Sequence, residues 1–201
     1  MFSNGYFLIA SGVFNSGGRG VKVFQKLKKT KNFFLLDRIS SIMPKVAVGG
    51  TFQYLHDGHY KLIKKAFEIA GPEKVYIGLT SDAMLRKNHK VEDYESRKAQ
   101  LLKCFQKMGI GKERYEITRL NDPYGLTLEE DYDCIVVSPE TYPVALKINR
   151  IREKNGKKKL EIAYVEYVMA EDATPISSTR IAKGEIDRHG KLKKEPNFQQ
   201  V

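Results

Sequence analysis

The chain has 201 residues, 41% of them apolar, which is enough for one well-buried core, so one domain is the expectation. No stretch approaches the roughly 20 apolar residues of a transmembrane helix, and we expect no membrane partner. The two cysteines, Cys104 and Cys134, lie in apolar stretches. They favour reduced core residues over a disulfide, which fits a cytoplasmic protein.

The net charge of +11 is unevenly distributed. Residues 1–42 hold seven lysines and arginines against one aspartate, a net charge of +6, which leaves +5 for the rest. We expect residues 1–42 to be a poorly ordered basic extension, which the choice of an upstream start codon would explain. The alternative is a functional basic arm. The main domain is expected at 43–190, and 191–201 as a flexible basic tail. The net charge of +5 on residues 43–201 is no more than a binder of polyphosphate substrates needs. We therefore expect no nucleic-acid partner.

Predicted strands and helices alternate from residue 45 onward. Apolar runs predict strands at 45–49, 74–80, 115–120, 133–137 and 160–165, and helical periodicity predicts helices at 56–70, 94–108, 141–153 and from about Ser177. This order predicts an α/β fold, Rossmann-like and doubly wound, with a mainly five-stranded parallel sheet and helices on both faces. Ligands bind beyond the carboxyl ends of such strands. We therefore expect one site where the following loops converge: 50–58, 80–93, 121–127, 138–141 and 170–179.

A glycine-rich turn and two histidines follow the first strand. Gly50 and Thr51 stand at the turn, and His56 and His59 flank Gly58 at the start of the next helix. A helix N-terminus presents free amides and a positive dipole end, which suits phosphate. Histidines three residues apart can donate to the same phosphate, and Gly58 lets a ligand approach the backbone.

Other interpretations of the histidines are open at this point. One histidine at a helix start can be a solvated or capping residue. A metal pair would need a third ligand, and none stands at a familiar spacing.

A second polar segment stands about 120 residues further on, at 176–180. Ile176, Ser177, Ser178, Thr179 and Arg180 offer three hydroxyls, free amides at a helix start and a guanidinium. Such a turn can hold nucleotide phosphates, although an ordinary Ser/Thr cap would have the same residues.

Together, the Gly50-Thr51-Phe52 turn with the His-x-Gly-His motif and the 176–180 segment resemble the two signatures of the nucleotidylyltransferase superfamily. That superfamily includes nicotinamide-nucleotide adenylyltransferases, cytidylyltransferases and, more distantly, class I aminoacyl-tRNA synthetases. The segments 121–125, 136–142 and 147–152 further resemble the phosphopantetheine adenylyltransferases of the archaeal and eukaryotic kind. The resemblance runs from about Lys45 to about Gly184, with Pro143-Val144 in place of the expected small residues.

The resemblance implies adenylyl transfer from ATP to 4′-phosphopantetheine, giving dephospho-coenzyme A and diphosphate, with Mg²⁺ accompanying ATP. Catalytic roles would fall to His59, His56 and Thr51. The ATP site would comprise Gly50, Gly58, Ile176, Ser177, Ser178, Thr179 and Arg180. The acceptor site would comprise Thr80, Lys87, Lys90, Arg97, Asp122, Tyr124 and Glu140. The resemblance implies no protein ligands for a metal and leaves a homo-oligomer open.

Two alternatives remain. One is an enzyme of the same superfamily with another acceptor, such as nicotinamide mononucleotide, a flavin or a polyol phosphate. The other is a nucleic-acid-binding protein, which the basic balance would suit.

Overall fold

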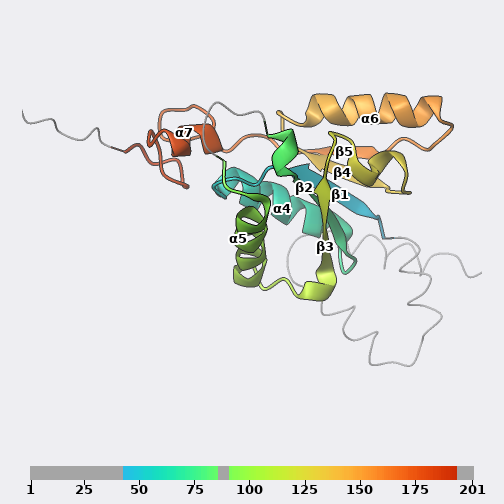
Figure 1. The fold of residues 1–201 in the computed structure, drawn as a ribbon, viewed down its shortest axis with the longest axis horizontal. Helices are drawn as coiled ribbons and strands as arrows, with labels where there is room; N and C mark the ends of the chain where they lie inside the picture. The colour runs from blue at the N-terminus through green and yellow to red at the C-terminus, as the bar shows by residue number, and fades with distance from the viewer. Residues whose placement is uncertain (1–42, 86–90, 194–201) are drawn as a thin grey trace, which may run out of the picture. The chain divides into compact units, whose positions relative to one another are not determined.

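The computed structural model describes residues 43–85 and 91–193 (Figure 1). Five strands form one sheet in the order β3-β2-β1-β4-β5: β1 (Val46–Gly50), β2 (Val75–Thr80), β3 (Tyr115–Leu120), β4 (Cys134–Val137) and β5 (Glu161–Tyr164). Every pairing is parallel, and Val48 of β1 lies opposite Ile77 and Val136 on its two sides. The predicted five-stranded parallel sheet is confirmed.

Helices cover both faces of this sheet, as predicted. The helices are α4 (Asp57–Ala70), α5 (Tyr94–Lys107), α6 (Tyr142–Lys154) and the short α7 (Ser178–Ala182). Side chains alternate across a strand, so Val46 and Val48 pack with residues of α4 and α5. Ala47, between them, packs with Ala145 and Ile148 of α6 on the opposite face. In Figure 1, α6 accordingly lies on one side of the sheet and α4 and α5 on the other.

The strand order determines where a ligand can bind. From β1 the chain moves outward through β2 to β3, then crosses back to β4 on the other side of β1. The loops after β1 and β4 therefore leave toward opposite faces, which opens a crevice at the carboxyl ends of the central strands.

Three short 3₁₀ turns were not predicted: Asp82–Met84, Lys112–Arg114 and Gly125–Leu128. Each is three or four residues long and carries no apolar period of its own. The first and third follow β2 and β3 closely, and they shape the loops that surround the crevice.

A turn spans the expected domain boundary at residue 190. Residues 185–193 fold back on themselves: the Lys193 amide donates to the Glu185 carbonyl at 3.0 Å, and the Asp187 amide donates to the Lys191 carbonyl at 2.9 Å. The carboxylate of Asp187 also accepts from the amide of His189. The basic composition of this segment did not indicate the turn, because backbone amides make its hydrogen bonds, to carbonyls and to the Asp187 carboxylate. Residues 1–42 and 194–201 lie outside the described residues.

Both cysteines are buried free thiols, as expected. Burial raises the pKa of the Cys134 thiol to about 11, so this thiol is protonated at neutral pH. Within residues 43–85 and 91–193, no helix is long and apolar enough to cross a membrane.

Candidate active site

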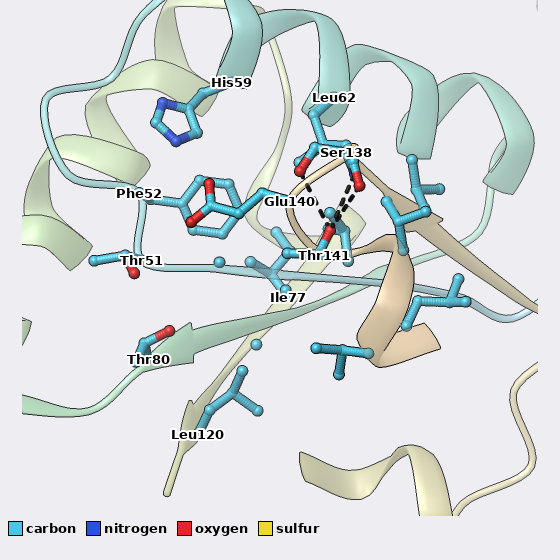
Figure 2. A pocket seen from close by; sticks show the side chains of 18 of the residues that line it. Thr51, Phe52, His59, Leu62, Ile77, Thr80, Leu120, Ser138, Glu140 and Thr141 are labelled. Atoms are coloured by element: carbon cyan, nitrogen blue, oxygen red, sulfur yellow. Dashed lines mark hydrogen bonds between the residues drawn. The ribbon is translucent and has the colours of Figure 1, made fainter. Parts of the chain in front are cut away.

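A cavity of about 770 Å³ opens at the carboxyl ends of the strands (Figure 2). It is lined from each of the five predicted loops, so their convergence is confirmed. The predicted site residues that line it are Gly50, Thr51, His56, Gly58, His59, Thr80, Asp122, Tyr124, Glu140, Ile176, Ser177, Ser178, Thr179 and Arg180.

The turn between β1 and α4 has an unusual backbone. The φ angle is 49° at Phe52 and 45° at Tyr54, in the left-handed region that residues other than glycine rarely adopt. Each such residue costs of the order of 1 kcal/mol or more and persists only where its surroundings hold it. Phe52 is fully buried in the core, which fixes one side of the turn. The turn delivers Thr51 to the cavity (Figure 2).

His56 is the N-cap of α4, one residue before the helix begins. Its Nδ1 accepts a hydrogen bond from the Gly58 amide at 3.2 Å, so the ring proton of the neutral side chain resides on Nε2. Burial lowers the pKa of His56 to about 4, which keeps the imidazole neutral at pH 7. His56 therefore offers a donor without a positive charge.

His59 lies in the first turn of α4, beside His56. The ring centroids of the two histidines are 3.9 Å apart, and the His59 ring is 5.5 Å from that of Phe52. A side-chain carbon on Gly58 would come within 3.0 Å of the His56 ring. Glycine at 58 thus leaves room for His56, a reason that the sequence did not reveal.

The 176–180 segment starts α7 and borders the same cavity. The hydroxyl of Ser177 caps the helix by accepting from the Arg180 amide. Ser178 is buried, and its hydroxyl donates to the Gln53 carbonyl. The Ser178 hydroxyl thus ties the two signature segments together. Thr179 is exposed.

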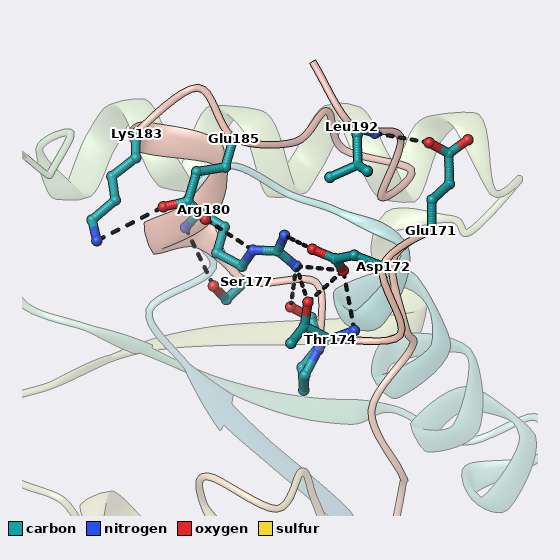
Figure 3. A network of polar contacts seen from close by, with 9 residues as sticks. Glu171, Asp172, Thr174, Ser177, Arg180, Lys183, Glu185 and Leu192 are labelled. Atoms are coloured by element: carbon teal, nitrogen blue, oxygen red, sulfur yellow. Dashed lines mark hydrogen bonds and ion pairs between the residues drawn. The ribbon is translucent and has the colours of Figure 1, made fainter. Parts of the chain in front are cut away.

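The guanidinium of Arg180 is engaged by acidic residues (Figure 3). Asp172 binds it through both carboxylate oxygens, and the Nε of Arg180 donates to Glu185 at 3.0 Å. The hydroxyl of Thr174 is a further partner at 3.0 Å. The sequence predicted a phosphate ligand, but in the structure this cation is paired with two carboxylates.

The expected acceptor side borders the cavity at several points. Thr80 ends β2, and Glu140 lies in the loop after β4 (Figure 2). Asp122 folds its own loop, since its Oδ1 accepts from the amides of Tyr124 at 2.7 Å and Gly125 at 2.8 Å. The Lys147 ammonium lies 5.5 Å from the centre of the Tyr124 ring.

Arg97 is not among the residues that line the cavity, so the structure does not bring it together with the other predicted acceptor residues. Its side chain is fully buried in α5 and donates to the carbonyls of Thr51 and Glu92 and to the carboxylate of Asp82. In this structure its guanidinium is therefore enclosed by protein acceptors. Lys87 and Lys90 lie outside the described residues.

The sequence did not single out the apolar part of the cavity. Leu120, Val144 and the predicted Tyr124 line it near the carboxyl end of β3 and the start of α6. Its inner end reaches the core between the sheet and α6, where the rings of Tyr76 and Tyr132 meet edge to face with centroids 5.3 Å apart. Tyr76 and Val144 stand in predicted strand and helix segments, and Tyr132 stands just before a predicted strand. Nothing in those patterns distinguishes a core position from the wall of an internal cavity.

The described residues contain no group of three or more His, Cys, Asp and Glu side chains that could hold a metal ion. At many nucleotide sites Mg²⁺ is bound through phosphate oxygens and water.

Comparisons with known proteins identify the family of this chain. The cytidylyltransferase-like family model matches residues 47–184. The chain is 77% identical over 153 residues to the phosphopantetheine adenylyltransferase of Methanosarcina acetivorans, covering 76% of this chain and 98% of that protein. It is 49% identical over 146 residues to the Archaeoglobus fulgidus protein of the same name, covering 73% and 97%.

Among solved structures, a protein of unknown function from Archaeoglobus fulgidus has a TM-score of 0.56 at 43% identity, covering 60% of this chain and 88% of that one. A tyrosyl-tRNA synthetase from the same organism, with a TM-score of 0.54 at 15% identity, covers 75% of this chain and 64% of that one, and it shows the shared fold alone. The chain belongs to the cytidylyltransferase-like family and, within it, to the phosphopantetheine adenylyltransferases.

Proposed function

We propose that the cavity transfers an adenylyl group from ATP to 4′-phosphopantetheine, as a step of coenzyme A biosynthesis. The acceptor phosphate attacks the α-phosphorus of ATP, a new P–O bond forms, and the bond to the β-phosphate breaks. The products are dephospho-coenzyme A and diphosphate. The observation that carries this proposal is the pair of histidines at the start of α4, bordering one cavity with the 176–180 segment.

The chemistry needs no general base, because a phosphate monoester with a second pKa near ~6 is largely a dianion at neutral pH. Catalysis then consists of alignment and of stabilising the charge that develops on the α-phosphate. In this proposal His59 donates to that phosphate in the transition state. Neutral His56 donates from Nε2 to bound nucleotide phosphate, and Thr51 orients the attacking phosphate.

The ATP phosphates are proposed to contact the 176–179 segment and the start of α4. The dipole and free amides of α4, a helix of 14 residues, favour an anion there. Arg180 contributes indirectly, because its guanidinium is paired with Asp172 and Glu185 and holds the loop in shape. Mg²⁺ is proposed to enter with ATP, held by the phosphates.

The acceptor is proposed to extend along the apolar lining near the carboxyl end of β3 and the start of α6, where Leu120, Tyr124 and Val144 lie. The pantetheine arm is long, flexible and mostly uncharged apart from its phosphate. A wall of aromatic and aliphatic side chains with a polar rim suits such a ligand. Nicotinamide mononucleotide or a polyol phosphate would leave much of this wall without a partner.

The direct test is an acceptor panel. Purified full-length protein is mixed with Mg·ATP and, separately, 4′-phosphopantetheine, nicotinamide mononucleotide, a flavin mononucleotide or a polyol phosphate. Diphosphate release is measured, and the product is identified by mass. We expect release only with 4′-phosphopantetheine, with dephospho-coenzyme A as product. Faster release with another acceptor would contradict the assignment.

A further inference from the structure

Arg97 combines complete burial with three separate partners. Arg97 is 0% exposed, and Arg152, at 1%, is the next most buried charged residue among those described. Nη1 donates to the Thr51 carbonyl at 2.9 Å, Nε to the Glu92 carbonyl at 2.8 Å and Nη2 to Asp82 Oδ1 at 2.8 Å. One guanidinium thus joins the turn after β1, the 3₁₀ turn after β2 and the approach to α5.

Burying a guanidinium costs several kcal/mol unless acceptors surround it. The stability of the core alone does not require a buried arginine, since an apolar residue of similar volume often gives an equally or more stable protein. The position of the three acceptors is therefore informative. One of them belongs to Thr51, the residue proposed to orient the attacking phosphate.

The turn held by Arg97 has a strained backbone. Phe52 and Tyr54 have positive φ angles, and such a conformation persists only where its surroundings determine it. Arg97 holds the carbonyl before Phe52, and the buried Ser178 hydroxyl holds the carbonyl of Gln53 after it. These two bonds fix the turn from outside, from α5 and α7.

We propose that Arg97 is a positioning residue of the transfer reaction: it fixes the Thr51 backbone so that the Thr51 side chain meets the attacking phosphate in line. This inference rests on the proposed function for the role of Thr51, although the link from Arg97 to the turn does not. A misplacement of about 1 Å in a reacting pair can cost a factor of about 100 in rate. Losing Arg97 should therefore lower kcat and leave the KM of ATP nearly unchanged.

The kinetic test is a double-mutant cycle of Arg97→Lys and Thr51→Val. Lysine keeps the charge but cannot reach three acceptors in separate directions. We expect Arg97→Lys to lower kcat by about tenfold in the wild-type background and by less than about twofold in the Thr51→Val background, with the KM of ATP unchanged within about twofold. An additive cycle, or an unchanged kcat in either single variant, would overturn the proposal.

Arg152→Lys is the matched control. Arg152 is also fully buried, and it also binds three backbone carbonyls: those of Thr127, Glu130 and Lys158. None belongs to the turn after β1. We expect a similar loss of melting temperature, but any effect on kcat should add to that of Thr51→Val.

Hydrogen exchange distinguishes this proposal from the proposed reaction. Amides of residues 51–54 should exchange at least about tenfold faster in Arg97→Lys and not in Arg152→Lys, whatever the acceptor proves to be. Unchanged exchange at 51–54 would overturn the proposal even in a fully active enzyme. If Arg97→Lys does not fold, Asp82→Ala provides the second variant. It removes one anchor of the guanidinium at a half-exposed side chain, with the same direction expected for kcat and for exchange.

Discussion

At the scale of single residues, the neutral state of His56 is the feature with the widest consequences. The ring is buried, caps α4 and receives the Gly58 amide at Nδ1. Protonation would place a charge in a buried position and would end the Nδ1 hydrogen bond. His56 can therefore donate to phosphate at neutral pH only as an uncharged imidazole, whereas positive potential comes from the helix itself.

The lowered pKa of His56 predicts that acid destabilises the folded protein. The pKa of this side chain is lowered from 6.5 to about 4 in the folded chain, so the unfolded chain binds more protons between these values. The free energy of unfolding should fall as the pH drops from about 6.5 to about 4, by up to about 3 kcal/mol from this group. Urea unfolding across this pH range measures it.

His56→Asn is the control for that experiment, because asparagine keeps the N-cap and does not titrate. This variant should lose most of the decline that the wild-type chain shows between pH 6.5 and 4. An identical pH profile in the two proteins would mean that other groups cause the acid sensitivity.

Gly58 gives a second prediction at this scale. Alanine at this position would press within 3.0 Å of the His56 ring, which has little room to move beside His59. We expect Gly58→Ala to lower kcat by roughly tenfold through displacement of the imidazole. Steady-state kinetics measures it. Gly111→Ala is the control for replacing a glycine, because the φ of −69° at Gly111 suits alanine and the nearest atoms belong to the movable Glu113 side chain. Wild-type kcat in Gly58→Ala would contradict this account of the turn.

At the scale of elements, the segment 171–185 depends on polar contacts more than on packing. Among the described residues, the small apolar cluster beneath this segment buries Ile176 together with the flanking Ala170 and Ile186. The shape of the loop before α7 therefore rests on Arg180 and its carboxylates. Bonds from Thr174 and from Arg180 lower the pKa of Asp172 to about 2, which keeps this carboxylate charged at neutral pH.

Asp172→Ala should therefore weaken ATP binding more than it slows transfer. Without Asp172, Arg180 loses its two-oxygen partner, and the loop that presents residues 176–179 loosens. We expect the KM of ATP to rise by about five- to tenfold, with kcat within about threefold of wild type. Steady-state kinetics with each substrate varied in turn measures both.

Lys183→Ala is the matched control for the loop. Lys183 is an exposed residue of the same segment and pairs with Glu185 at 3.8 Å. Such surface pairs contribute little, so both kinetic constants should stay at wild-type values. Equal KM values for ATP in Asp172→Ala and Lys183→Ala would show that the Arg180 network does not shape the ATP site.

At the scale of the whole molecule, the part of the chain from residue 45 onward contains all five strands of the described sheet. A chain starting at Met43 retains all five strands of this sheet, helices α4 to α7 and both signature segments. It should therefore fold, keep full adenylyltransferase activity and melt within about 3 °C of the full chain. Calorimetry and the diphosphate assay measure this. An insoluble or inactive shortened chain would show that residues 1–42 are part of the folded unit.

The sequence predicted the sheet well, because buried parallel strands are continuous apolar runs such as 134–137 and helices carry a period of their own. It also predicted which loops converge. It did not predict that Arg97 and Arg180 bind carbonyls and carboxylates of the protein itself. An arginine that binds phosphate and one that binds protein acceptors look alike in a sequence. Arg97 and the Thr51 carbonyl that it binds are 46 residues apart in the sequence, and only the folded chain brings them together.

The central claim is that His59, at the start of α4, stabilises charge on the α-phosphate during adenylyl transfer to 4′-phosphopantetheine. The most direct measurement is the single-turnover rate of dephospho-coenzyme A formation by the wild-type protein and by His59→Ala, together with the ATP dissociation constant of each. We expect the rate to fall by about 100- to 1,000-fold, while ATP affinity weakens much less. A variant that retains more than about a third of the wild-type rate would contradict the account.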